Sequence, residues 1–500
     1  MAVPDEPTHV IRAVAIAHGD LASRFRTVPL AGGLTEPLTD VSVPVPFAGL
    51  AGVPACFAFR PEQPASCSPA IPDHGPMVRA TTYVGTYPPT FYLLVGWPSR
   101  LLSPRPSIYA MRLLAALIGA ALLASGARSI LESRRRDAAV LLSGLGLALT
   151  PATVFLLGSV NPNGLEIAAA CGVWLGALAI ADSDGPPTRR LLLRFLVALA
   201  LMVGLRPLSP VLAVGIVALV AIGHLGAARA RDLLRLRPVL LTAGVAVMAV
   251  TAAELRAIVS HSSTAIITSR LVGTHDRWVF FHESLHQTRE WGLQLVGRLG
   301  WLDTPLPSIV VGSWAAGAGL LVAYALVVGS WRARIGLVAT CAAAVVLPVV
   351  AEMASGPTVG MGWQGRYGLP VAVGVPILSG WTISRSTRQH RAVAVTLGAV
   401  VAIVVGVGHL GAMVRLLNRY AVGLPSGVFS FVGAGRGTSP LSWEALGVAA
   451  MAVSALTFAW LVVPLAVDGT SAGGTDEPGV DDVELDLRVR EGSGSRVGVG

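Results

Sequence analysis

The chain has 500 residues, of which 53% are hydrophobic and only 13% are charged, with a formal net charge of +9. Together with a mean hydropathy of +0.67, this composition excludes a soluble globular protein and predicts a polytopic membrane protein. The chain contains no Lys, and many of its Arg residues fall in short loops between apolar runs. The positive charge therefore follows the positive-inside rule and does not indicate nucleic-acid binding.

Two adjacent carboxylates and an imidazole stand at the start of the chain. Asp5 and Glu6 open a short amphipathic helix, and His9 follows one helical turn later. Because acidic pairs are costly in or beside lipid, this group is a candidate functional site. The alternative is that Asp5 caps the helix and Glu6 lies near its positive end.

Residues 1–106 contain no apolar run of membrane length, and their seven Arg balance seven acidic residues. A long neutral segment can be translocated, so we expect it to be extracytoplasmic. A Cys56–Cys67 disulfide would need an oxidising compartment and predicts the same side, with two unpaired thiols as the alternative. Export of this segment needs an upstream span, so we expect that a first span is missing from the chain; the alternative is that the first helix drives export.

The remaining chain reads as a transmembrane helical domain over residues 107–467. About 20 apolar residues cross a bilayer, and the pattern predicts about eleven spans. The run at 191–204 is short and ends at Arg206-Pro207, so it and its neighbour form a candidate broken pair. The predicted runs are 107–126, 138–158, 164–181, 191–204, 208–225, 238–254, 307–330, 335–353, 366–383, 392–412 and 445–467.

Every second loop of this domain is rich in Arg, which places those loops in the cytoplasm. The intervening loops, 159–163, 205–207, 255–306, 354–365 and 413–444, then face outward with residues 1–106. Residues 468–500 are rich in Gly, Ser and acidic residues and predict a disordered cytoplasmic tail. The chain is thus expected to be a multi-pass protein of the cell membrane.

Six blocks carry a resemblance to a known family. They are Pro4-Asp5-Glu6-Pro7-Thr8-His9 with Arg12-Ala13, Tyr87-Pro88-Pro89-Thr90-Phe91-Tyr92, Asn161-Pro162-Asn163-Gly164-Leu165-Glu166, Arg206-Pro207-Leu208-Ser209-Pro210, Gly300-Trp301-Leu302-Asp303-Thr304 and Gln364-Gly365-Arg366-Tyr367-Gly368-Leu369-Pro370. In this order they resemble a large actinobacterial family of predicted integral membrane proteins without assigned function. That family is similar to the GT-C glycosyltransferases, which use polyprenyl-phosphate sugars.

The resemblance implies an all-α, GT-C-like transmembrane bundle with a large first extracytoplasmic loop. It also implies transfer of a sugar from a polyprenyl-phosphate donor to a cell-envelope glycan or glycoprotein. In GT-C enzymes an acidic residue of that loop lies near a metal ion or the acceptor hydroxyl, and Asp5 and Glu6 occupy the matching place. Asp5 is the expected base, Glu6 its partner or a ligand of Mg²⁺ or Mn²⁺, and His9 a group that orients either carboxylate.

The leaving lipid phosphate favours Arg, whose planar fork pairs with phosphate. Arg206 and Arg366 each lie at a predicted outer membrane boundary, with Tyr367 adjacent to Arg366. The alternative for each Arg is snorkelling to the interface.

A second group of polar residues follows Asn161 and Asn163, which precede an apolar run that contains Glu166. A carboxylate there is costly unless it is paired, and Arg206 or Arg366 is its expected partner. Tyr87, with Tyr83 and Tyr92, is expected to stack on a sugar ring or to belong to an aromatic belt at the interface.

Two other functions are compatible with the sequence. His282-Glu283-Ser284-Leu285-His286 fits the zinc-protease pattern H-E-x-x-H, but no third ligand stands out, and we interpret the run as an interfacial helix. A transporter or flippase of lipid-linked glycans also fits about eleven spans, but it predicts an internal repeat that the sequence does not show.

Overall fold

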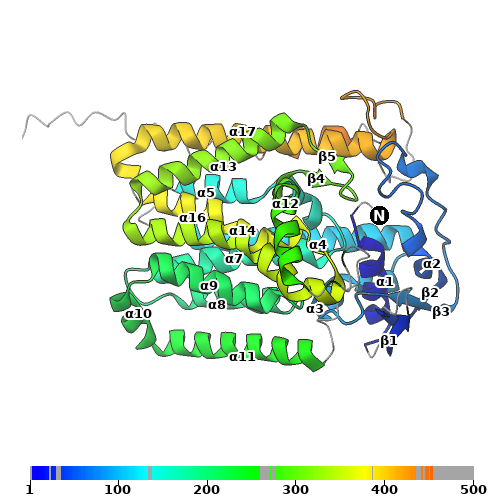
Figure 1. The fold of residues 1–500 in the computed structure, drawn as a ribbon, viewed down its shortest axis with the longest axis horizontal. Coiled ribbons are helices and arrows are strands. Elements are labelled where there is room, and N and C mark those ends of the chain that lie inside the picture. Colours follow the sequence, from blue (N-terminus) through cyan, green and yellow to red (C-terminus); the bar gives the residue numbers. More distant parts are fainter. Residues whose placement is uncertain are drawn as a thin grey trace, which may run out of the picture.

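The computed structural model describes residues 3–21, 24–29, 35–132, 138–259, 271, 274, 276–385, 387–434, 441–442, 445–449, 451–453 and 456. It consists of a bundle of long helices with a smaller mixed segment packed at one end (Figure 1). The mixed segment contains α1 (Glu6–Ala17), β1 (Arg24–Pro29), β2 (Thr35–Pro44), α2 (Val45–Ala48), β3 (Met77–Thr82), α3 (Thr90–Val95) and η4 (Trp97–Arg100).

The helical bundle follows directly in the chain. Its elements are α4 (Pro104–Leu131), α5 (Ala138–Ala148), α6 (Pro151–Leu157), α7 (Pro162–Ala181), α8 (Arg189–Val203), α9 (Ser209–His224), α10 (Ala227–Leu234), α11 (Arg237–Val259), α12 (Arg277–Val296), β4 (Arg298–Leu299), β5 (Thr304–Pro305), α13 (Ser308–Val328), α14 (Trp331–Val359), α15 (Gly365–Ala372), α16 (Gly374–Ser384) and α17 (Thr387–Ala421).

The bundle agrees with the apolar pattern of the sequence. Each predicted run between residues 107 and 412 coincides with a helix or with two consecutive helices. In the described part of the chain, seven helices are long and apolar enough to cross a bilayer, or eight if α5 and α6 form one bent span. The protein is therefore a helical membrane protein. The number of about eleven spans stays a prediction, because residues 445–467 lie largely outside the described residues.

The sequence analysis predicted an all-α fold, but the first segment also contains strands. Strands β1, β2 and β3 form a three-stranded antiparallel sheet in that order. Val41 and Val43 of β2 are buried, whereas Asp40 and Ser42, which alternate with them, are half-buried. This alternation with a period of two is typical of a strand with one covered face, but it is too short to stand out beside the long apolar runs.

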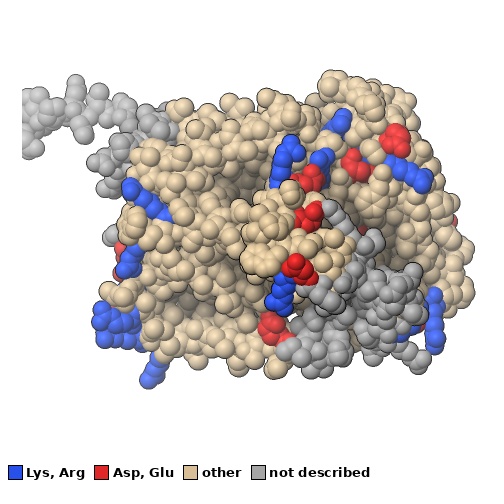
Figure 2. Space-filling model, viewed as in Figure 1, with Lys and Arg blue, Asp and Glu red and all other residues tan. Residues whose placement is uncertain are grey.

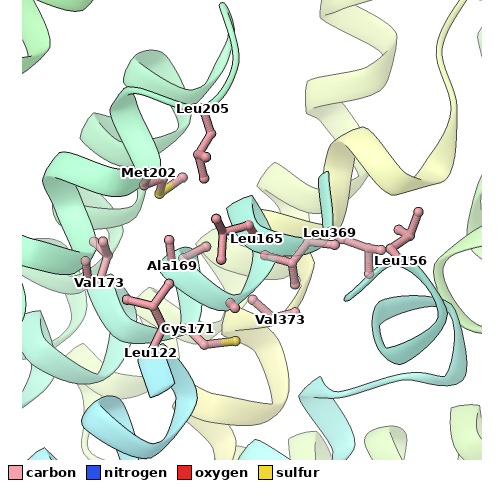
Figure 3. Packing of buried hydrophobic residues seen from close by; sticks show 14 of the residues in the cluster. Leu122, Leu156, Leu165, Ala169, Cys171, Val173, Met202, Leu205, Leu369 and Val373 are labelled. Atoms are coloured by element: carbon pink, nitrogen blue, oxygen red, sulfur yellow. The ribbon is translucent and has the colours of Figure 1, made fainter. Parts of the chain in front are cut away.

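Helix α7 forms the centre of the bundle, and almost all of its residues are buried. Figure 3 shows Leu165 of this helix between Met202 and Leu205 on one side and Leu369 and Val373 on the other. A helix that is apolar on every face is buried on every face. This position fixes the first turn of α7, with its polar residues, in the middle of one end of the bundle.

The predicted run at 138–158 is a bent pair in the structure. Helices α5 and α6 meet at an angle of 69°. Pro151 starts α6, and the Thr150 side chain accepts a hydrogen bond from the backbone N–H of Thr153, which is the usual signal for a new helix start. The Trp314 indole N–H donates to the freed carbonyl of Leu147 at 3.1 Å.

The loops fall into two groups, one at each end of the bundle. Figure 2 shows Arg side chains gathered at the end where α10 lies. There, Arg194 pairs with Glu132 at 2.6 Å and Arg385 pairs with Asp182 at 3.1 Å, which joins loops that the charge pattern assigns to one side. The loops before α4, α7, α9 and α15 meet at the opposite end. Which end faces the cytoplasm stays a prediction.

Candidate functional site

Helix α1 brings the predicted carboxylates into the interior. Asp5 occupies the N-cap position, but its side chain makes no capping hydrogen bond, and its backbone is left-handed with φ of 66°. Residues Glu6 to Ile16 are all buried, against β2, β3, α3 and η4. The predicted short helix is present, and its polar as well as its apolar residues are buried. The sheet, which was not predicted, and α3 cover the faces that would otherwise meet water.

The Asp5 carboxylate lies between two partners that are distant in sequence. Arg366 of α15 forms an ion pair with its Oδ2, and the Tyr83 hydroxyl donates to its Oδ1 at 2.5 Å. Burial alone raises the pKa of Asp5, but the charge of Arg366 and the hydrogen bond from Tyr83 outweigh it, so the net pKa lies below its usual value. Asp5 is therefore an ionised carboxylate, and 27% of its side chain is accessible.

Glu6 has a different partner and no accessible surface. Arg112 of α4 donates to its two carboxylate oxygens at 2.8 and 2.7 Å, and the backbone N–H of Val160 donates to Oε1 at 3.0 Å. Burial raises the pKa of Glu6, but the charge and hydrogen bonds of Arg112 lower it to about 2. This pair holds α1 against α4 and α7.

The two carboxylates do not form a shared metal site. Each is neutralised by its own Arg and already accepts hydrogen bonds at both oxygens. Mg²⁺ and Mn²⁺ need several oxygen ligands that are free of competing cations. No group of three or more His, Cys, Asp or Glu suited to a metal occurs among the described residues. These side chains do not fit the predicted divalent cation, and we assign it no role.

His9 lies deeper in the same segment. Its Nδ1 is 2.9 Å from the Tyr92 hydroxyl, and its ring lies 5.9 Å from the ring of Tyr87. Burial lowers the pKa of His9 to about 3 and outweighs the attraction of the Asp5 charge, so the imidazole is neutral. The structure pairs His9 with Tyr92, whereas the sequence analysis expected it to orient Asp5 or Glu6.

The two predicted phosphate-binding arginines lie together on one aromatic ring. The guanidinium carbons of Arg206 and Arg366 are 4.6 and 5.2 Å from the centre of the Tyr367 ring. Arg206 pairs with Glu166 at 3.0 Å, and the Ser209 hydroxyl donates to the same carboxylate at 2.5 Å. Of the two partners expected for Glu166, the structure contains Arg206.

Both guanidinium groups have a donor that is not used. The Nε atoms of Arg206 and Arg366 are buried and have no hydrogen-bond partner among the described residues. The side-chain Oδ1 of Asn163, at the start of α7, is also buried without a partner. Buried polar atoms without partners are uncommon in folded proteins, and a ligand or an ordered water can complete their hydrogen bonds. The Nε atoms of Arg229 and Arg419 share this feature.

Asn161 joins the start of α7 to the start of the chain. Its Oδ1 accepts from the backbone N–H and the side-chain amide of Asn163 at 3.0 and 2.6 Å, and its Nδ2 donates to the Pro4 carbonyl at 3.3 Å. Asn161 is thus the N-cap of α7 as well as a support for Asp5. A contact of either Asn with substrate stays a prediction.

Several residues of this site were not predicted. Arg112 was detectable, because it is a charged residue inside an apolar run. Glu352 of α14 and Gln294 of α12 were not: they accept from the backbone N–H groups of Gly362 and Gly365, at 2.9 and 2.7 Å. These two acceptors fix the loop that leads into Arg366.

A small pocket opens beside Arg366. Its walls come from the start of the chain, α6, α12 and the β4–β5 hairpin, and they are mostly apolar. Its lining residues are Val3, Pro4, Ala152, Phe155, Leu156, Gln294, Arg298, Gly300, Leu302 and Arg366.

The H-E-x-x-H run lies on α12, away from Asp5. His282 and His286 are exposed one turn apart, and the Gln287 side-chain amide donates to Glu283 at 3.2 Å. No third metal ligand joins them among the described residues. Nothing in the described structure supports the protease interpretation.

Residues 1–375 match the model of a family described as "Predicted membrane protein (DUF2142)". This match covers three quarters of the chain and all six sequence blocks, so the chain belongs to this family of membrane proteins. No curated protein matches the chain. No solved structure matches it either.

Proposed function

We propose that this member of the family is a membrane glycosyltransferase that moves a sugar from a polyprenyl-phosphate donor to a cell-envelope acceptor. The observation that carries the proposal is the group of Asp5, Arg366, Tyr367 and Arg206, in which both guanidinium groups are buried and retain an unused donor. An anion with several oxygens completes these donors, and the phosphate of a lipid-linked sugar is such an anion at the end of a membrane bundle.

The reaction needs a base and a site for the leaving group. The acceptor oxygen forms a bond to the anomeric carbon, the bond between this carbon and the phosphate oxygen breaks, and the lipid phosphate leaves with the electron pair. Asp5 takes the proton of the acceptor hydroxyl. Arg206 and Arg366 stabilise the charge that develops on the phosphate.

The ion pair of Asp5 and Arg366 links donor binding to the strength of the base. While Arg366 faces only Asp5, it holds the carboxylate pKa low and makes Asp5 a weak base. A phosphate that shares Arg366 neutralises part of its charge, and the pKa of Asp5 then rises towards the usual value. Asp5 is thus a stronger base when donor is bound.

The direct test measures sugar transfer in membranes from radiolabelled polyprenyl-phosphate donors of several sugars. We expect Asp5→Asn to lower transfer at least about 100-fold. A matched control is Asp40→Asn, which removes a carboxylate of the same segment that pairs with Arg26 at 2.9 Å. Transfer that is equal in wild type and Asp5→Asn overturns the assignment, and so does the absence of transfer from every donor.

The bend between α5 and α6 favours a second candidate, a flippase of lipid-linked glycans. Broken helices often form the binding sites of transporters, and Ala152, Phe155 and Leu156 of α6 line the pocket beside Arg366. In proteoliposomes a flippase moves a fluorescent lipid-linked sugar between leaflets without an acceptor. Movement without transfer selects this candidate.

A further inference from the structure

The β4–β5 hairpin carries an aromatic side chain next to the pocket. Gly300 and Leu302 in its turn both have left-handed backbones, with φ of 61° and 62°. Asp303 closes the turn, because its Oδ1 accepts from the backbone N–H of Trp301 at 3.2 Å and from the Thr304 hydroxyl at 2.9 Å. This turn belongs to a sequence block to which the proposed chemistry assigns no role.

A second aromatic residue, Phe59, meets Trp301 from the first segment. The two rings are 5.6 Å apart in an edge-to-face arrangement. Phe59 also has a left-handed backbone, with φ of 61°, and it is 68% exposed. A bulky residue in this conformation is uncommon and costs free energy, so the surrounding structure holds it there.

The loop that carries Phe59 is held at several points. Cys56 and Cys67 form a disulfide that closes it. Arg419 of α17, which is fully buried, donates to the carbonyls of Phe57 and Gln63 at 2.7 and 2.6 Å. The same Arg419 pairs with Asp303 of the hairpin at 2.7 Å. One buried cation therefore holds both aromatic loops in a fixed relation.

The two rings lie next to the C-terminal end of α17. The part of this helix that is long and apolar enough to cross a bilayer, Thr396–Ala421, reaches the same end. Arg419 is in the last turn of α17, at the end where the Phe59 loop packs (Figure 1). Arg415, Asn418 and Arg419 make this last part of the helix polar, so we expect it to lie at the membrane surface. The exposed ring of Phe59 is then within reach of a ligand at that surface.

We propose that Phe59 and Trp301 form a platform on which a sugar ring of a glycan stacks. Sugar rings have an apolar face that fits an exposed aromatic ring, and their hydroxyl groups need charged or polar neighbours. Arg60 and Glu62, both exposed, follow Phe59 in the chain and have no side-chain partner among the described residues. Leu302, next to Trp301, lines the pocket that reaches Arg366. The identification of this glycan as the acceptor rests on the proposed function, but its binding does not.

The test separates binding from transfer. Saturation-transfer NMR of purified full-length protein with cell-envelope oligosaccharides measures binding without turnover, and titration gives the affinity. We expect Phe59→Ala and Trp301→Ala each to weaken binding about tenfold or more. Phe429→Ala is the matched control, because Phe429 is also exposed, lies at the same end of the bundle and is remote in sequence from the platform.

In transfer assays, Phe59→Ala and Trp301→Ala are expected to raise the KM for acceptor and to leave the KM for donor unchanged. Phe59→Tyr keeps an aromatic face. It is therefore expected to bind the oligosaccharide about as well as the wild type, in contrast to a folded Phe59→Ala protein. Glycan binding that depends on Phe59 in a protein without transfer activity sustains the platform and overturns the glycosyltransferase. Transfer with an acceptor KM that is indifferent to both substitutions overturns the platform alone, and so does a preference of the wild type for lipid vesicles over oligosaccharides.

Discussion

The two ends of the bundle use ion pairs in different ways. At the end with α10, Arg128 and Glu132 are 65% and 37% exposed, and their pair lies in water. At the opposite end, Glu6 and Glu166 are fully buried, and they pair with Arg112 and Arg206, whose side chains are 22% and 7% accessible. Exposed pairs contribute little to stability, whereas buried pairs cost desolvation that is offset only by close geometry. The pairs of Glu6 and Glu166 lie at the end of the bundle where we propose the site.

The largest effect is expected where removal of a partner leaves a buried charge alone. Glu6→Ala removes the carboxylate that pairs with Arg112, so it leaves this largely covered guanidinium without a counter-ion. The variant should destabilise the protein by about 3–5 kcal/mol. Thermal unfolding in detergent, followed by circular dichroism, measures this. If Arg112→Leu in the same chain does not recover part of the loss, the pair is not the cause.

Arg366→Met tests the other buried cation. It removes the group that pairs with Asp5, so the pKa of Asp5 should rise and the binding of a lipid phosphate should fall at least about tenfold. Donor binding to purified protein, with Arg366→Lys as the variant that keeps the charge, measures the second effect. Unchanged donor binding in Arg366→Met shows that the phosphate lies elsewhere.

Stability should also depend on pH through His9. Burial lowers the folded-state pKa of His9 to about 3 from a usual value of 6.5. Between these pH values His9 is protonated in the unfolded chain and neutral in the folded protein. The contribution of neutral His9 to the free energy of unfolding is therefore fully present above pH 6.5, and it decreases as the pH falls from 6.5 towards 3. Unfolding temperatures at several pH values measure this decrease. His9→Gln should flatten the curve in that window, whereas His74→Gln, at an exposed position, should leave it unchanged.

The smallest effect is expected at the exposed end. Glu132→Gln breaks an exposed pair with Arg128 and a half-buried pair with Arg194, and it should cost about 0–1 kcal/mol because the Glu132 carboxylate itself remains in contact with water. Sugar transfer should remain at the wild-type level. A loss of transfer in Glu132→Gln would remove the contrast between the two ends.

Much of the fold follows from the sequence, because an apolar run is a local pattern. It predicts a membrane helix without any knowledge of the contacts that the helix makes. The runs from 107 to 412 all coincide with helices, and the alternation of Arg-rich loops matches the two ends of the bundle. The bend at Thr150-Pro151 was missed, although a capping Thr before Pro is a local signal of a helix start. The apolar run that continues through it concealed this signal.

The site was predictable as a set of residue types but not as a set of contacts. Asp5, Arg206, Glu166 and Arg366 were all selected, because charges next to apolar runs are uncommon. Their pairing depends on tertiary packing across 361 residues, from Asp5 to Arg366, which no local pattern encodes. The burial of α1 was missed for the same reason, since it depends on a sheet and helices that other segments provide.

The separation of Asp5 from Arg366 also sets the order of assembly. A ribosome adds about 5–20 residues per second, so Asp5 is made roughly 20–70 s before Arg366. During that interval Glu6 already has Arg112 and Val160 available, whereas Asp5 has no cationic partner from α15. The site is therefore completed only after most of the bundle has been inserted. A nascent or truncated chain that ends before α15 holds the Asp5 carboxylate without its Arg366 partner.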